Sequence, residues 1–165
     1  MSKNGSVNWE RLSDKLHEET DLLGARIAPQ NLLKSWEAGH AVVRHTEDEI
    51  VAYVSLWETD HPLWFELGTL WVDRRYRERK ISSDIFYECF NTRTNGSGIF
   101  IVTHHPKVIH LANKFGFNEA TKENWSSVPW SVTCAPCDRL SEKEKENCPF
   151  RATNEECTLL FKQKR

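Results

Sequence analysis

The stretch from Trp64 to Phe90 constrains the fold of this chain most, because it joins an apolar segment, a basic loop and an apolar stripe in direct succession. Residues 64–72 are apolar and aromatic with Glu66 as the one ionisable group, which predicts a largely buried strand. Residues 73–80 hold five basic side chains against two acidic ones. From Ile81 onward, apolar residues recur at spacings of four and five, which predicts a helix with one buried face. The amides and dipole at the start of such a helix form an anion site.

The segment Tyr76 to Ser83 resembles the acyl-CoA-binding core of the GNAT superfamily of N-acyltransferases, whose signature is Arg/Gln-x-x-Gly-x-Gly/Ala. Arg77 and Ile81 match this signature, whereas Lys80 and Ser82 stand at the two glycine positions. Glycine at these positions lets the backbone approach a diphosphate closely. The Lys80 side chain could bind the diphosphate through its charge instead of through a close approach of the backbone, or it could block the groove. Both alternatives stay open.

A second block strengthens the resemblance. Residues 99–103 are apolar and largely β-branched, which predicts a strand, and residues 107–115 carry apolar side chains at helical spacing. Gly116 and Phe117 then provide a helix C-cap and its hydrophobic partner. A strand, a helix and Gly-Phe are similar to the second half of the GNAT cofactor fold, so the resemblance covers Trp64 to about Glu119, roughly a third of the chain.

The remaining elements complete an α/β pattern. Apolar spacing predicts a helix from a Ser6 cap to about Leu23, and a short second helix that ends at Gly39. Residues 40–44 and 50–56 predict a hairpin. The expected architecture is a single GNAT-like domain over residues 1–165, with a mixed, mostly antiparallel sheet flanked by helices.

Composition narrows the classes of partner. A length of 165 residues suits one domain, and a net charge of −2 argues against general nucleic-acid binding. No apolar run reaches membrane-spanning length, and the first residues lack an apolar signal core. We therefore expect a cytoplasmic protein without nucleic-acid or membrane partners, either a monomer or a homodimer.

The resemblance implies that backbone amides bind most of the acyl-CoA. The Leu70 amide would polarise the thioester carbonyl, Val72 would pair with the pantetheine arm, and the amides of residues 77–83 would hold the diphosphate. The implied CoA-binding positions are Leu70, Trp71, Val72, Arg77, Glu78, Arg79, Lys80, Ile81, Ser82, Ser83 and Asn113.

Glu66 is the candidate general base. Amine acylation needs a neutral nitrogen, and a carboxylate with a raised pKa can remove the proton of an ammonium group directly or through water. Glu66 lies among apolar residues and six residues before the end of its strand, where several GNAT enzymes keep a glutamate base. The alternative is a carboxylate on an exposed or half-exposed strand face, or a partner for one of the arginines. Many GNAT enzymes place a tyrosine acid where this chain has Ala112, and the adjacent Asn113 points elsewhere on the helix.

Four cysteines stand in the C-terminal third, in an excursion of about residues 134–157. Cys134 and Cys137 form a Cys-x-x-Cys pair, and Cys148 and Cys157 follow at ligand-like spacing for a structural zinc ion. Free structural thiols and a redox pair are the alternatives.

These observations predict an N-acetyltransferase that moves an acetyl group from acetyl-CoA to an amine by direct attack. The identity of the amine stays open, because acceptor loops vary freely. Two rival hypotheses are a catalytically degenerate GNAT fold that binds CoA and a zinc-stapled protein-interaction module.

Overall fold

The computed structural model describes residues 7–19, 27–47, 49–77, 79–93, 96–103, 105–121, 123–124, 127 and 158–164. The helices are α1 (Trp9–Glu19), α2 (Pro29–Glu37), α3 (Ile81–Asn91) and α4 (Pro106–Lys114), with a short 3-10 helix η1 (Arg74–Tyr76). The strands are β1 (Ala41–His45), β2 (Ile50–Glu58), β3 (Trp64–Val72), β4 (Gly98–Thr103), β5 (Asn118–Glu119) and β6 (Thr158–Gln163). None of the described helices is long and apolar enough to cross a membrane.

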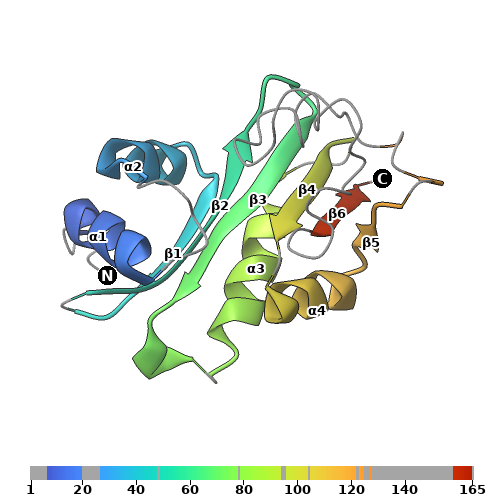
Figure 1. Cartoon of the computed structure of the whole chain (residues 1–165). Helices are drawn as coiled ribbons and strands as arrows, with labels where there is room; N and C mark the ends of the chain where they lie inside the picture. The colour runs from blue at the N-terminus through green and yellow to red at the C-terminus, as the bar shows by residue number, and fades with distance from the viewer. Residues whose placement is uncertain are drawn as a thin grey trace. The chain divides into compact units, whose positions relative to one another are not determined.

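The strands form one six-stranded sheet in the order β1-β2-β3-β4-β6-β5 (Figure 1). β3 and β4 are parallel, whereas the β1–β2, β4–β6 and β5–β6 pairs are antiparallel. The predicted α/β class with a mixed, mostly antiparallel sheet is confirmed.

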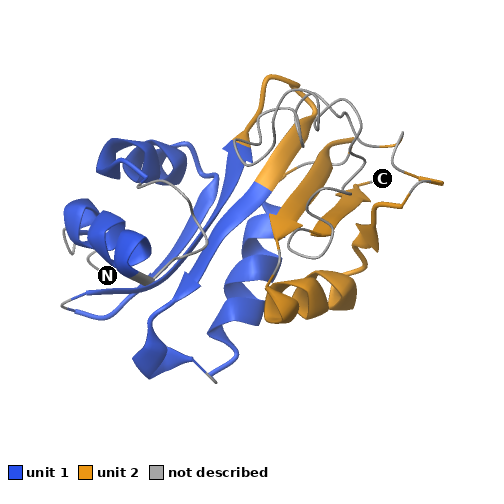
Figure 2. Cartoon of the chain, viewed as in Figure 1, with its two compact units in different colours: residues 1–57, 67–92 blue, residues 58–66, 93–165 orange. Residues whose placement is uncertain are grey.

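The chain forms two compact units, and strand β3 contributes to each (Figure 2). The first unit comprises residues 1–57 and 67–92, and the second comprises residues 58–66 and 93–165. Each unit has its own hydrophobic cluster.

The first unit is built on the inward faces of α1 and α2. Buried residues from these helices, the hairpin and β3 form one cluster, consisting of Leu12, Leu16, Leu32, Ile50, Tyr53 and Trp71. Trp9 adds ring contacts to Trp36 and Tyr53 at centroid distances of 5.6 and 6.5 Å. Asn8 caps α1, because its Oδ1 accepts a hydrogen bond from the Arg11 amide at 2.9 Å. This cap lies two residues after the predicted Ser6, which is outside the described residues.

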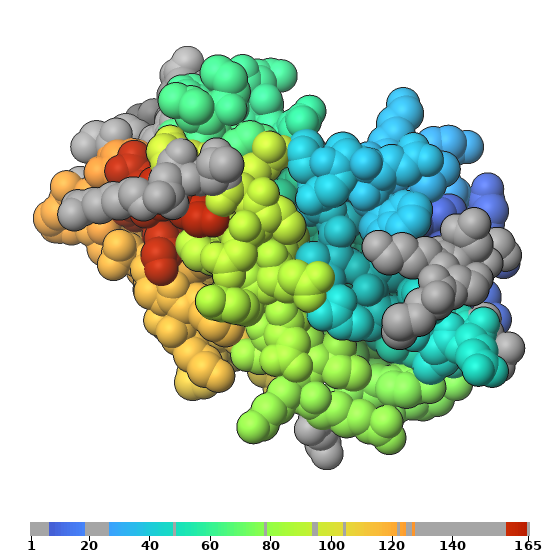
Figure 3. All heavy atoms as spheres, turned by 180° about the vertical axis from the view of Figure 1, so that it is seen from behind, coloured from blue at the N-terminus to red at the C-terminus, as the bar shows by residue number. Residues whose placement is uncertain are grey.

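Helix α3 packs in the first unit through the stripe that the sequence predicted. Its buried residues are Ile85, Phe86, Cys89 and Phe90. The Cys89 thiol donates to the His40 carbonyl at 3.6 Å beside β1, so this cysteine is a core residue, as expected. The space-filling view from behind shows the outer side chains of α3 at the surface beside β1 (Figure 3).

The second unit is organised around β4. Six residue pairs join β4 to β6, from Gly98↔Gln163 to Thr103↔Thr158. The cluster on this sheet consists of Trp64, Phe100, Ala120, Leu159 and Phe161. Helix α4 ends at Lys114 and is followed by Gly116, which has φ +77, and the Lys162 Nζ donates to the Phe115 carbonyl at 2.7 Å.

Gly98 allows the Trp64 ring to pack flat on the sheet. The two residues are partners in the β3–β4 register, and a Cβ added to Gly98 would lie 2.5 Å from the indole ring. Real carbon atoms do not approach so closely, so glycine is required by space at this position.

We expect Gly98→Ala to lower the free energy of unfolding by about 1–3 kcal/mol, because the indole ring has to move out of a packed cluster. Thermal unfolding measures this loss. In a Trp64→Leu background the same substitution should cost much less, because the ring that it meets is absent. An equal loss of stability in both backgrounds would contradict the conclusion that the Trp64 ring requires glycine at position 98.

Candidate functional site

The loop between β3 and α3 is fixed at its start by backbone and carboxylate hydrogen bonds. The Asp73 amide donates to the Val51 carbonyl of β2 at 2.9 Å. The Asp73 carboxylate accepts from the Arg75 amide at 3.0 Å and so caps η1. The Arg77 Nε then donates to the Val72 carbonyl at 2.8 Å. This arginine, which matches the family signature, holds the loop against the end of β3.

Lys80 is the residue that turns the loop into helix α3. Its φ of +59 lies in the left-handed region, which residues other than glycine rarely adopt. The Lys80 carbonyl accepts from the Asp84 amide at 3.1 Å. The amides of Ile81, Ser82 and Ser83 therefore precede the intrahelical ladder and are available to an anion. The backbone thus has the conformation of a glycine where the sequence has lysine.

The cations of the loop divide into two kinds. Arg75 forms an ion pair with Asp73 at 2.9 Å and another with Glu49, so its charge is compensated. Arg79 lies over the Tyr76 ring at 5.3 Å and remains exposed, as do Arg77 and Lys80. Part of the local positive charge that the sequence predicted is therefore neutralised by structural ion pairs.

The end of β3 has buried side chains. Trp71 is 4% exposed and belongs to the cluster of the first unit, Val72 is also buried, and Leu70 is half-buried. These side chains serve packing, and the expectation that their backbone meets a ligand stays a prediction.

Thr69 interrupts β3 in a way that the sequence did not predict. Its φ is +55, and its buried hydroxyl accepts from the Trp57 Nε1 at 3.1 Å. A positive φ inside a strand breaks the regular pleat. The ladder of β3 with β4 ends three residues earlier, at Glu66↔Phe100, although β4 continues to Thr103. Threonine is a typical strand residue and gives no signal, but Gly68 directly before it could have indicated the break, because an isolated glycine inside a strand often accompanies a bulge.

Glu66 occupies a partly buried position on β3. Burial alone raises the pKa of its carboxyl above the ordinary value of 4.5. Within the described residues, no ion pair or hydrogen bond reaches this carboxylate. The alternative that Glu66 pairs with an arginine therefore finds no support in the described part, and a raised pKa suits a general base.

Helix α4 carries no acid at the position where the resemblance places one. Ala112 is fully buried, and Asn113 is exposed next to it. The His105 side chain caps α4 by accepting from the Lys107 amide at 3.3 Å, which gives this histidine a structural role.

Several predicted residues lie outside the described residues. They are Glu78 and the four cysteines of the zinc hypothesis, Cys134, Cys137, Cys148 and Cys157. In the part of the chain that the structure describes, no group of three or more histidine, cysteine or carboxylate side chains could hold a metal ion.

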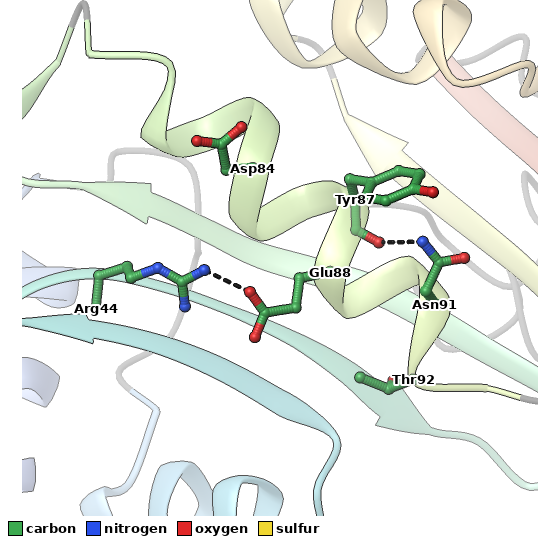
Figure 4. Close-up of a pocket in the computed structure, with 6 residues that line it drawn as sticks. All are labelled: Arg44, Asp84, Tyr87, Glu88, Asn91 and Thr92. Atoms are coloured by element: carbon green, nitrogen blue, oxygen red, sulfur yellow. Dashed lines mark hydrogen bonds and ion pairs between the residues drawn. The ribbon is translucent and has the colours of Figure 1, made fainter. Parts of the chain in front are cut away.

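A shallow groove of about 450 Å³ lies on the outer face of α3, and Arg44 of β1 completes it (Figure 4). The Arg44 guanidinium points at Glu88 and forms an ion pair with it. The other lining residues are Asp84, Tyr87, Asn91 and Thr92. None of the predicted site residues lines this groove, so it is separate from the loop.

The chain matches the family model described as Acetyltransferase (GNAT) family over residues 9–117. This match covers more than half of the chain. The protein therefore belongs to the GNAT acetyltransferase family, as the resemblance implied.

Solved structures agree in fold. Naa50 of Arabidopsis thaliana, in complex with the bisubstrate analogue CoA-Ac-MVNAL, is 16% identical with a TM-score of 0.57, and 93% of each chain is covered. Diaminobutyrate acetyltransferase EctA of Paenibacillus lautus is 14% identical with a TM-score of 0.57, covering 93% of this chain and 87% of EctA. A putative acetyltransferase of Salmonella typhimurium, yncA, is 13% identical with a TM-score of 0.58, covering 93% and 84%. No curated protein matches the sequence.

We expect Lys80→Gly to raise the free energy of unfolding by about 0.5–1 kcal/mol. Relief of the left-handed strain outweighs the extra freedom that glycine has in the unfolded chain. Chemical denaturation measures this gain. Lys80→Ala is the matched control, because it removes the side chain and keeps the strain, so it should bring no gain. A loss of stability in Lys80→Gly would show that the left-handed conformation is not the native one.

Proposed function

We propose that this chain is an N-acetyltransferase that transfers the acetyl group of acetyl-CoA to an amine by direct attack. The observation that carries the proposal is the left-handed Lys80, because this conformation is the one that glycine adopts readily, and the family signature has glycine at this position. The amides of Ile81, Ser82 and Ser83 would then donate to the diphosphate of CoA. The exposed cations Arg77 and Arg79 would add charge at the rim.

The reaction assigned to Glu66 is proton removal from the acceptor. The neutral amine attacks the thioester carbonyl, the new N–C bond forms, and the C–S bond breaks to release the CoA thiolate. The Leu70 amide would donate to the carbonyl oxygen, on which negative charge develops. The pKa of Glu66, raised by burial, supports the base role.

Protonation of the CoA thiolate is assigned to solvent. The position of the expected acid holds the buried Ala112, and a methyl group has no proton to give. The thiolate of CoA is a good enough leaving group to depart without a dedicated acid, but the step is slower.

Two neighbours in structure suggest which classes of amine to test first. Naa50 was solved with a peptide-containing bisubstrate analogue, and EctA was solved with its substrate L-2,4-diaminobutyric acid and coenzyme A. Peptide N-termini and small diamines are therefore the first acceptors to screen, with free CoA thiol as the readout.

The buried Ala112 favours one second candidate, a CoA-binding protein without turnover. This candidate would bind CoA through the same β3–α3 loop as the enzyme but would not catalyse acetyl transfer. Binding of CoA without release of thiol from acetyl-CoA, for every amine in the screen, would favour it over the enzyme.

We expect saturating CoA to raise the melting temperature by about 5–10 °C, because a ligand at 100 times its Kd stabilises the folded state by about 2.7 kcal/mol. Differential scanning fluorimetry measures the shift. Pantetheine is the control, since it lacks the diphosphate and should shift the melting temperature much less. The absence of any shift with CoA would exclude both the enzyme and the CoA-binding module.

We expect Glu66→Gln to lower kcat/KM at least about 100-fold while leaving the CoA-induced thermal shift intact, because glutamine cannot take a proton. In the wild type, kcat/KM should fall as the pH drops through the raised pKa of Glu66, which lies above 4.5. The variant should lack this acidic limb. The exposed Glu119→Gln should behave like the wild type. Unchanged turnover in Glu66→Gln would remove this residue from the mechanism.

A further inference from the structure

Lys15 is a shielded cation at the centre of an ion network in the first unit. Its neighbours on α1, Leu12 and Leu16, are buried, and the Lys15 side chain itself is only 19% exposed. The Lys15 Nζ lies 3.0 Å from Asp73 Oδ2 and 3.1 Å from Glu49 Oε2. It also lies 5.6 Å from the centroid of the Trp71 ring. A lysine is rarely shielded to this degree unless it is paired, and this one has two carboxylate partners.

Asp73 is the residue through which this network reaches the cofactor loop. It follows β3 directly, and its carboxylate accepts from the amide, the Nε and the terminal nitrogen of Arg75 at 2.9–3.0 Å. Hydrogen bonds from Arg75, with a further one from Lys15, hold the pKa of Asp73 well below its usual range. The Asp73 carboxylate is therefore stabilised as an anion by both cations.

The contacts continue from Asp73 as far as Arg77. The Tyr76 amide donates to the Asp73 carbonyl at 2.8 Å, and the Arg77 amide donates to the Arg74 carbonyl at 3.4 Å. The Arg77 side chain returns to the Val72 carbonyl. A displacement of the Asp73 carboxylate would therefore disturb residues 74–77, which come shortly before Lys80 in the chain.

Arg11 shows what is particular to Lys15. It lies one turn earlier on the same helix and also pairs with Glu49, at 3.4 Å, but its side chain is 57% exposed. Within the described part of the chain, Lys15 and Arg75 are the cations that form ion pairs with Asp73. Exposed pairs contribute little, whereas a shielded pair fixes geometry.

We propose that Lys15 is a positioning residue for the diphosphate loop, and that it ties helix α1 to the start of that loop through Asp73. Lys15 makes no contact with acyl-CoA in this scheme, so its loss weakens CoA binding only by loosening the loop. The inference rests on the proposed function, because it takes the loop to be the CoA-binding element.

The test compares Lys15→Met with Arg11→Met. Methionine keeps the apolar length of each side chain and removes its charge, so Arg11→Met is the matched control for losing a cation beside Glu49. We expect Lys15→Met to raise the Kd for CoA, measured by titration calorimetry, roughly three- to tenfold. Arg11→Met should leave the Kd within twofold. Lys15→Arg, which keeps the charge, should recover part of the lost affinity.

Hydrogen exchange without ligand provides the second readout. In Lys15→Met, the amides of residues 74–77 and 79–83 should exchange faster, while those of the buried strand β2 should not change. An unchanged Kd, an equal loss in Arg11→Met, or exchange that rises evenly over the whole chain would overturn the proposal. If the wild type binds no CoA, the proposed function fails, and the exchange comparison still decides whether Lys15 positions the loop.

Discussion

Hydrogen bonding at the two ends of strand β3 is the constraint on which the candidate site depends. Its first residues pair with β4, where Gly98 leaves room for the Trp64 ring. At its other end, the Asp73 amide is hydrogen-bonded to β2, and the side chain of the same residue caps η1. Because the strand cannot slip at either end, the loop begins at a defined point, and its exit into α3 is defined by the backbone of Lys80.

Charge has two separate tasks around this loop. Lys15, Glu49, Asp73 and Arg75 compensate one another and hold elements in place. Arg77, Arg79 and Lys80 are exposed and can meet an incoming anion. Arg75 is itself exposed, so what separates it from the other exposed cations is its pairing with the shielded carboxylates of Asp73 and Glu49. The division explains how a chain with a net charge of −2 can present a locally basic loop.

Periodicity and composition predicted much of the fold, because an element with one buried face carries apolar residues at a regular spacing. The apolar stripe from Ile81 and the Gly116 cap placed α3 and α4 to within about a residue, and the Arg77 signature indicated the family. The left-handed conformation of Lys80 was not predictable from the residue itself, because the path of the backbone on both sides imposes it. The contact between Lys15 and Asp73 joins residues 58 positions apart, and local patterns do not report such pairs.

The pairing of β4 with β6 sets an order of events during synthesis. Thr103 and Thr158 are partners, so this ladder closes a chain loop of more than fifty residues. Closure of a long loop is entropically slow, and it requires the last residues of β6 to have left the ribosome. The first unit, whose residues end at position 92, has all its strands long before then. The β4–β6 ladder of the second unit therefore forms after the strands of the first unit have been synthesised, and until then this edge of β4 is open to pairing with a neighbouring chain.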